Sequence, residues 1–221
     1  MARVDVLAPL LREQPKFHGP TAGTVNWAIG ADVLAWLDAN IQPDWATLET
    51  GCGYSTIVFG ARAKSHTVVA PRAAEHDLIK AWLDSHGIVH DHIAFEAMGS
   101  QRALPRLIDD GELNCVLIDG MHGFPMPFID WYYTANRLAV GGAMIVDDTQ
   151  IRPCAMLRDF LASERGRWER LVDLERATIF RRITAEPVSE GVFWRDQPSA
   201  HQTVVDRLQR KLASYKRRLT A

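Results

Sequence analysis

Short apolar runs alternate with amphipathic segments through the middle of the chain. Each apolar run spans about five residues, which is typical of a buried strand. The longer segments between them carry apolar residues at helical spacing. We expect strands at Ala46–Thr50, His66–Ala70, His92–Glu96, Cys115–Asp119 and Ala143–Asp147. We expect helices at Tyr54–Ala63, Ala73–His86, Gln101–Asp109, Pro125–Leu138 and Pro153–Glu164.

This alternation predicts a largely parallel sheet with helices on both faces. Two extended runs then follow each other closely, Trp168–Leu174 and Thr178–Ile183. Such a pair forms a hairpin, so the sheet is expected to end in antiparallel strands. The predicted fold is an α/β, Rossmann-like doubly wound sheet of about seven strands, mostly parallel with a terminal antiparallel hairpin. N-terminal helices and a C-terminal helix flank it.

The segments on either side of this pattern suggest four parts. The first is an N-terminal helical cap with helices at Val4–Leu11 and Val25–Ala39. Proline and glycine mark a linker before the C-terminal helix, with a short strand at Val192–Trp194. The predicted parts are the cap at 1–44, the Rossmann-like domain at 45–184, the linker at 185–200 and the C-terminal helix at 201–221.

The C-terminal helix combines an apolar seam with basic charge. Residues 201–221 carry six basic side chains against Asp206, and apolar residues recur at spacings of three and four. Such a seam favours a homo-oligomer formed through this helix. Docking onto the chain's own body, or peripheral contact with an anionic membrane, would use the same features.

Composition narrows the function classes. The chain has 221 residues, of which 47% are hydrophobic and 24% charged, and a net charge of −2. Residues 201–221 carry a net charge of +5, so residues 1–200 carry −7. A mildly acidic domain does not favour nucleic acid, and no nucleic-acid partner is expected. The early charges at Arg3 and Asp5 do not fit a signal peptide, and no apolar run is long enough to span a bilayer. Three isolated cysteines suggest neither disulfides nor zinc, so we expect a cytoplasmic protein.

A glycine turn follows the first predicted strand. The sequence Glu49-Thr50-Gly51-Cys52-Gly53 leads directly into the predicted helix at Tyr54–Ala63. In a strand–turn–helix arrangement, backbone N–H groups and the helix N-terminus face a ligand. The turn alone is also compatible with a simple tight connection.

Carboxylates follow two later strands. Asp119 ends the fourth predicted strand, and Asp147 and Asp148 end the fifth. These strand ends meet at one crevice, where mutual repulsion is costly unless a cation neutralises the carboxylates. Oxygen donors favour magnesium, calcium or manganese. His122 lies three residues beyond Asp119 and is a candidate general base. The remaining histidines, including His18, are expected to be structural or incidental.

Residues 45–183 resemble the class I S-adenosylmethionine (SAM)-dependent methyltransferases. The segment Glu49–Thr56 is similar to the first motif of that class. Ile118-Asp119-Gly120-Met121-His122 is similar to an I-D-G-x-H segment, and Gly141–Thr149 is similar to a G-G-x-x-x-x-D-D-T segment. The carboxylate set resembles that of metal-dependent O-methyltransferases of the catechol and macrolide-sugar type.

The resemblance implies a role for each matching residue. His122 and Asp119 would be catalytic, with His122 taking the proton of a small hydroxylated acceptor such as a sugar or phenolic metabolite. Asp119, Asp147 and Asp148 would bind a divalent metal, expected to be Mg²⁺. The residues expected to contact the cofactor SAM are Glu49, Thr50, Gly51, Gly53, Ser55, Thr56, Ala70, Ser100 and Asp119.

Two positions depart from the pattern of that class. Ala70 stands where its members usually carry an acidic residue for the ribose hydroxyls, and Glu75 or His76 could replace it. Ser100 or Gln101 stands where an aspartate often contacts the adenine. These departures leave open a non-catalytic Rossmann-like module that binds a partner or membrane through its C-terminal helix. A nicotinamide-dependent oxidoreductase fits less well, because the turn lacks the third glycine of that fingerprint.

Overall fold

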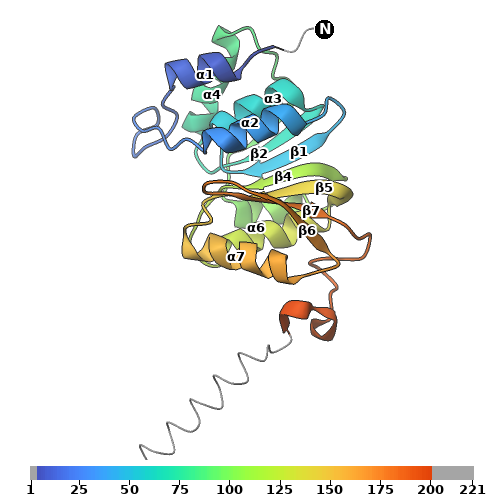
Figure 1. Ribbon diagram of the computed structural model, residues 1–221. Coiled ribbons are helices and arrows are strands. Elements are labelled where there is room, and N and C mark those ends of the chain that lie inside the picture. Colours follow the sequence, from blue (N-terminus) through green and yellow to red (C-terminus); the bar gives the residue numbers. More distant parts are fainter. Residues whose placement is uncertain (1–3, 201–221) are drawn as a thin grey trace, which may run out of the picture.

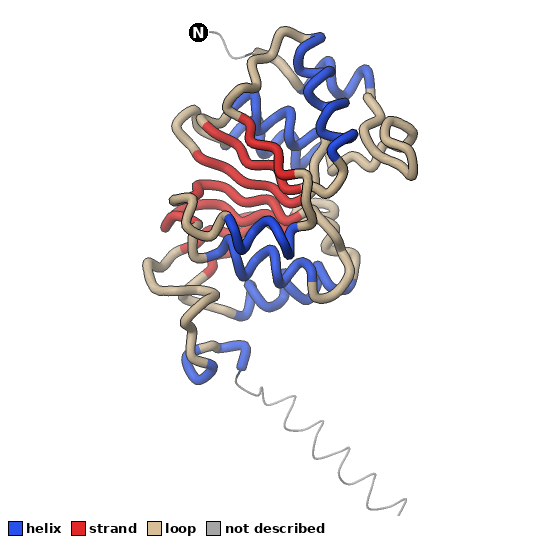
Figure 2. The backbone as a smooth tube through the Cα atoms, turned by 180° about the vertical axis from the view of Figure 1, so that it is seen from behind, coloured by secondary structure: helices blue, strands red, loops and turns tan. Residues whose placement is uncertain are grey.

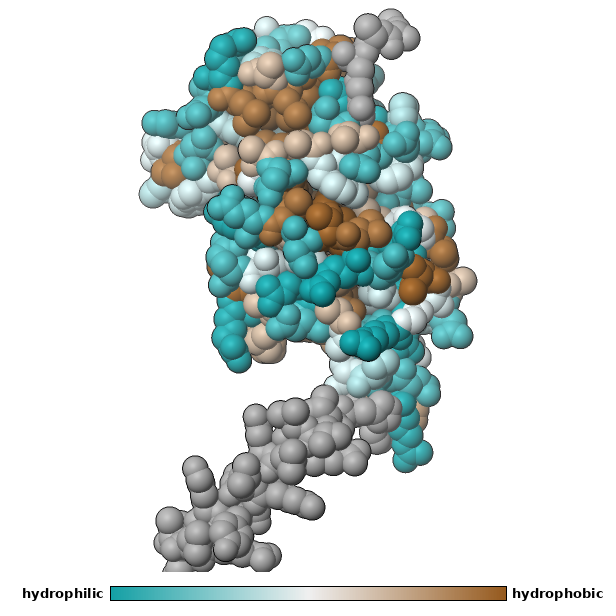
Figure 3. Space-filling model, viewed as in Figure 1, coloured by the Kyte–Doolittle hydropathy of each residue, from teal (hydrophilic) through white to brown (hydrophobic). Residues whose placement is uncertain are grey.

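The computed structural model describes residues 4–200. The predicted helix at 201–221 lies outside these residues, so self-association or membrane contact through it stays a prediction. No helix in the described part of the chain is long and apolar enough to cross a membrane. On the face shown in Figure 3, apolar residues gather in separate patches among hydrophilic ones.

A mixed seven-stranded sheet forms the centre of the molecule (Figure 1). Its order is β3-β2-β1-β4-β5-β7-β6, and β7 runs antiparallel to both of its neighbours, β5 and β6, whereas all other neighbouring strands are parallel. The predicted fold class is therefore confirmed, including the terminal hairpin. The strands are β1 (Ala46–Thr50), β2 (Ser65–Val69), β3 (Ile93–Glu96), β4 (Leu113–Ile118), β5 (Leu138–Val146), β6 (Trp168–Asp173) and β7 (Thr178–Arg182).

Helices cover both faces of the sheet (Figure 2). One apolar cluster joins the sheet to α1–α4, and a second joins its other face to α5–α7. Successive side chains of a strand point to opposite faces, so β4 contributes to both clusters. Cys115 and Leu117 belong to the first cluster, and Val116 and Ile118 belong to the second. The helices are α1 (Leu7–Glu13), α2 (Ala31–Asn40), α3 (Tyr54–Arg62), α4 (Ala73–Ser85), α5 (Ser100–Ala103), α6 (Met126–Ala135) and α7 (Arg152–Ser163).

The strand order reverses between β1 and β4, where the two strand ends come into close contact. The Asp119 N–H donates to the Thr50 carbonyl at 3.1 Å. A Cβ atom on Gly51 would lie only 2.3 Å from the Asp119 carbonyl oxygen, and Gly51 has a φ of +93°. Glycine is therefore required both for the backbone conformation and for the close approach. Ligand sites of doubly wound sheets lie at such a switch point.

The N-terminal segment packs into the same core as the sheet. Leu10 of α1 and Leu37 of α2 are fully buried in the cluster that also contains Ile57 of α3. The predicted helix at Val25–Ala39 is wrong in its first part, because α2 begins only at Ala31. Val25 instead forms an antiparallel bridge with His18. The non-helical chain between this bridge and α2 can therefore line the crevice at the strand ends.

Three other sequence predictions need correction. The helix expected at Gln101–Asp109 is the short α5 followed by a 3₁₀ turn at Leu104–Arg106, which contains a proline. The helix expected at Pro125–Leu138 ends at Ala135, because Leu138 begins β5. The strand expected at Val192–Trp194 does not form, and 3₁₀ turns occupy Trp194–Asp196 and Pro198–Ala200.

The segment predicted as a linker contacts the domain. Val188 is buried in the second apolar cluster. The N–H groups of Val188 and Ser189 both donate to the side-chain oxygen of Asn136, at 2.7 and 3.2 Å. This part of the linker is held against α6.

Replacing Gly51 with alanine is expected to lower the free energy of unfolding by at least about 2 kcal/mol, because the new methyl group collides with backbone that cannot move aside. Urea denaturation of Gly51→Ala measures this loss. Gly123→Ala is the matched control, since a Cβ there meets nothing within 4 Å. Equal stability of the two variants would contradict the close approach at the switch point.

Candidate functional site

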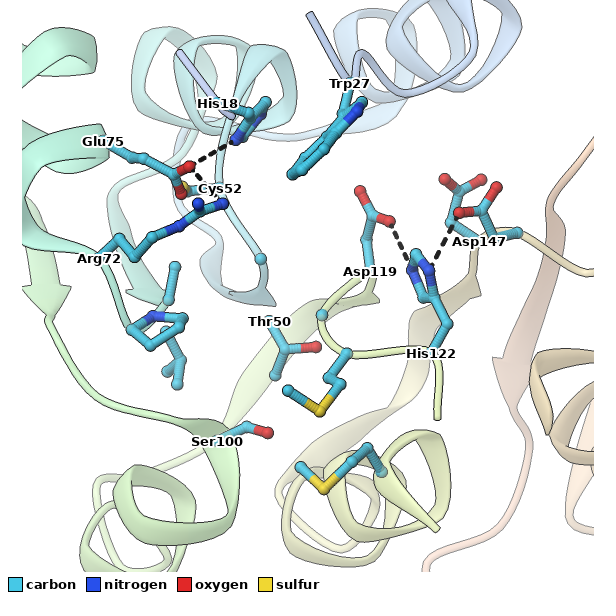
Figure 4. Close-up of a pocket in the computed structure, with 18 of the residues that line it drawn as sticks. His18, Trp27, Thr50, Cys52, Arg72, Glu75, Ser100, Asp119, His122 and Asp147 are labelled. Carbon is cyan, nitrogen blue, oxygen red and sulfur yellow. Dashed lines mark hydrogen bonds and ion pairs between the residues drawn. The ribbon is translucent and has the colours of Figure 1, made fainter. Parts of the chain in front are cut away.

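A pocket of about 880 Å³ lies at the carboxyl ends of β1, β2, β4 and β5. The N-terminal segment and the β6–β7 turn complete its wall, through residues such as Trp27 and Arg176. Figure 4 shows how the labelled side chains surround it. The predicted site residues that line it are Thr50, Gly51, Ala70, Ser100, Asp119, His122, Asp147 and Asp148.

Four predicted cofactor residues lie behind the wall: Glu49, Gly53, Ser55 and Thr56. Glu49 is fully buried and accepts hydrogen bonds from the hydroxyls of Ser55, at 2.5 Å, and Thr56. The Thr56 hydroxyl also accepts a bond from the Gly53 N–H at 2.9 Å. Glu49 thus has no exposed surface for a cofactor, which corrects the direct contact predicted for it. Its contacts fix the first turn of α3 and the glycine turn above.

The buried charge of Glu49 also has a partner from β2. His66 Nε2 lies 3.1 Å from Glu49 Oε1, and His66 Nδ1 lies 2.8 Å from the Thr47 hydroxyl. His66 is 1% exposed and stacks on Phe59. This network ties β1, β2 and α3 together below the turn. His66 is therefore structural, as the sequence predicts for the histidines outside the site.

A second polar group lies where β2 leads into α4. Ala70 lines the pocket without offering a polar side chain, and Glu75 lies beside it on α4. Glu75 Oε1 contacts the Arg72 guanidinium at 2.6 Å and His18 Nδ1 at 3.3 Å. His76 does not line the pocket and packs against Phe95. Of the two replacements considered for the acidic residue, only Glu75 reaches the pocket.

His18 was expected to be incidental, but it is 8% exposed and forms part of this wall. His18, Cys52 and Glu75 lie close enough to offer three donor atoms to one metal ion. Burial and the nearby Glu49 and Glu75 charges raise the pKa of the Cys52 thiol, which keeps it protonated. Since Arg72 already neutralises Glu75, the group acts as an ion-pair network.

The acidic end of the pocket collects the residues predicted to do chemistry. His122 lies between two carboxylates, with Nε2 3.5 Å from Asp119 and Nδ1 3.4 Å from Asp148. Donor atoms of Asp119, His122 and Asp148 all lie within 4.8 Å of one another. Asp147 lines the same pocket outside this group, and its buried Oδ1 has no hydrogen-bond partner among the described residues.

The electrostatics of these groups follow from burial and mutual repulsion. Desolvation, with the nearby Asp119 charge, raises the pKa of Asp147 to about 8. Desolvation also raises the pKa of Asp119. The contact with Asp119 raises the pKa of His122. A cation at this end of the pocket would lower the carboxyl pKa values again.

Sequence reasoning missed Asp130, on α6 below the pocket floor. It is fully buried, and both of its carboxyl oxygens lack a hydrogen-bond partner among the described residues. Desolvation raises its pKa to about 6, against the opposing effect of the Ser100 and Thr50 hydroxyls. The signal in the sequence was a carboxylate at a core-facing position of the predicted helix at Pro125–Leu138, and hydrophobic periodicity alone did not single it out.

Replacing Asp130 with asparagine is expected to remove a pH dependence of stability. The folded-state pKa of about 6 lies above the ordinary value of 3.8, so the neutral form is favoured by folding. Stability from this group is full below pH 3.8 and falls as the pH rises through 6, by about 3 kcal/mol. Urea denaturation between pH 4 and 7 should show a flatter profile for Asp130→Asn.

Asp159→Asn serves as the control, because Asp159 is exposed and pairs with Arg158 on the surface of α7. A wild-type slope that persists unchanged in Asp130→Asn would show that Asp130 does not titrate with a raised pKa.

One protein family matches the part of the chain that contains the strand ends of this pocket. Residues 48–149 match the family model described as a methyltransferase domain. No curated protein matches the sequence. The matched residues run from β1 to the end of the Asp147-Asp148-Thr149 segment, so they contain the glycine turn and both aspartate segments.

Solved structures share the fold at low identity. The O-methyltransferase NovP aligns with a TM-score of 0.62 and 15% identity, over 81% of this chain and 96% of that chain. An O-methyltransferase from Bacillus cereus, in complex with SAH, gives 0.62 and 13%, over 83% and 93%. TomG, an O-methyltransferase from Streptomyces achromogenes in complex with SAM, gives 0.57 and 16%, over 72% and 83%. The chain has the Rossmann-like fold of class I SAM-dependent methyltransferases.

Proposed function

We propose that this protein transfers a methyl group from SAM to a hydroxyl group of a small acceptor, such as a sugar or phenolic metabolite, with the help of a divalent metal ion. The observation that carries the proposal is one pocket in which the Gly51 turn lies beside Asp119, His122 and Asp148. The match to a methyltransferase domain supports the transferred group. Structural neighbours described as O-methyltransferases support oxygen as the acceptor atom.

The cofactor would lie along the glycine turn. Its methionine half would lie along the turn that Gly51 forms against the Asp119 backbone, and Glu49 fixes the turn from behind. Ser100 lines the pocket and offers a hydroxyl group, whereas Thr50 lines it with its hydroxyl buried. At the ribose, Ala70 can only pack, so Glu75 is the carboxylate closest in sequence that the pocket offers.

The donor set fits a divalent cation. Asp119 and Asp148 approach each other around His122, and Asp147 contributes a buried oxygen without a partner among the described residues. Asp119, Asp147 and Asp148 would hold the ion, as hard oxygen donors suited to Mg²⁺ or Mn²⁺. When bound, the ion would favour the ionised form of an acceptor hydroxyl.

His122 would accept the proton of that hydroxyl. Its side chain is 31% exposed and lines the pocket, so an acceptor can reach the ring. Asp119 and Asp148 orient the imidazole and stabilise its protonated form. The remaining pocket wall would position the acceptor hydroxyl in line with the sulfonium methyl group.

The first test is calorimetry with SAM and SAH. We expect binding of both to the wild type, since the pocket is already formed. His122→Gln should bind SAH unchanged but transfer methyl groups about 10²-fold more slowly or worse, because the proton acceptor is lost. His90→Gln is the control, because His90 pairs with Asp84 outside the pocket. Absence of binding at millimolar SAM and SAH would rule out the proposed function.

The metal site can be tested without an assay of activity. Mg²⁺ or Mn²⁺ should raise the melting temperature of the wild type, because the ion binds the folded state. The shift should be larger at pH 8 than at pH 6, since Asp147 with a pKa of about 8 must lose its proton first. Asp148→Asn should reduce the shift, and Asp159→Asn should leave it unchanged. A shift equal in all three proteins would contradict the assigned site.

A further inference from the structure

The turn between β6 and β7 reaches the pocket and is firmly anchored there. The Thr149 N–H and hydroxyl both donate to the Arg176 carbonyl, at 2.7 and 2.9 Å. The Glu175 N–H donates to Asp32 Oδ2 at 2.9 Å, which ties the turn to the start of α2. The backbone of Arg176 is therefore fixed from two sides of the pocket.

The guanidinium of Arg176 is held far more loosely than its backbone. Nη1 lies 3.9 Å from Asp148 Oδ1, and Nη2 donates to the Ala28 carbonyl at 3.4 Å. Both distances are at the long limit of such contacts. The side chain is 42% exposed and lines the pocket. The backbone of Arg176 is thus held in place, while its guanidinium N–H groups make only long contacts and can bind a ligand.

Asp148 places this arginine next to the predicted base. His122 Nδ1 contacts Oδ2 of Asp148, and Arg176 approaches Oδ1 of the same carboxylate. The two groups are separated by one carboxylate, so a single small molecule can reach both. The pocket wall contains two other arginines, Arg72 and Arg102. Arg102 lies on α5, which follows β3 at the opposite edge of the sheet from β6.

We propose that Arg176 selects an acceptor that carries an anionic group, a carboxylate or phosphate, in addition to the hydroxyl presented to His122. This inference rests on the proposed function and specifies the substrate class of the same site. An arginine fork pairs with two oxygens of such an anion, which fixes both position and orientation.

The pocket rim adds an apolar surface to this recognition. Trp27 is 61% exposed and Met121 is 67% exposed, and both line the pocket. Figure 4 shows the indole of Trp27 directed into the space beside Asp119. A flat ring can pack on these side chains while its polar substituents reach Arg176 and His122. A hydroxylated aromatic acid is therefore the suitable probe.

The experiment compares 3,4-dihydroxybenzoate with 3,4-dihydroxybenzamide, which has the same shape without the charge. Binding is measured by calorimetry at saturating SAH with Mg²⁺ present, after SAH binding alone has been recorded. We expect the wild type to bind the acid about tenfold more tightly than the amide. Arg176→Gln should remove this preference by weakening the acid alone, and Arg176→Lys should retain part of it. Arg170→Gln, on β6 of the same hairpin, is the control.

Several results would overturn the inference. These are equal binding of acid and amide to the wild type, binding of neither, or an equal loss of both in Arg176→Gln, which would indicate a merely structural arginine. Failure of the proposed function has a different signature, because SAH itself would then not bind in the first titration. Circular dichroism of each variant confirms that it is folded.

Discussion

The close approach of the β1 and β4 backbones is the constraint on which the pocket depends. Only a glycine at position 51 lets the Asp119 carbonyl come so near, and Asp119 begins the segment that carries His122. The same turn is fixed from below by the buried Glu49. A cofactor held along the turn would therefore lie beside the acidic end of the pocket. The contact between Gly51 and the Asp119 backbone thus places the glycine turn next to the acidic end of the pocket.

The acidic end is electrostatically costly in the absence of a cation. Burial and repulsion raise the pKa values of Asp119 and Asp147, and that of Asp147 reaches about 8. The imidazole of His122 and the more distant guanidinium of Arg176 offset part of this charge. Sites that retain such strained carboxylates commonly use them for metal binding or proton transfer. The arrangement is suited to a reaction in which an acceptor hydroxyl loses a proton.

The strands and the residues at their carboxyl ends could be predicted from the sequence, because both are local features of the chain. Apolar runs identified the strands, and parallel order placed Gly51, Asp119 and Asp147 at one edge. The roles of Glu49 and Arg176 could not be predicted in this way. Glu49 stands at the expected strand end, but its contacts depend on hydroxyls of α3 and on His66 of β2. Arg176 enters the pocket only because the β6–β7 hairpin folds back beside β5.

We propose that the sulfur of the bound cofactor lies between the glycine turn and the acidic end of the pocket. A crystal structure of the full chain with SAH tests it most directly. We expect SAH to lie along the Gly51 turn, with its sulfur facing Asp119 and His122 and its adenine near Ser100. SAH bound elsewhere, or with its sulfur turned away from His122, would contradict this placement.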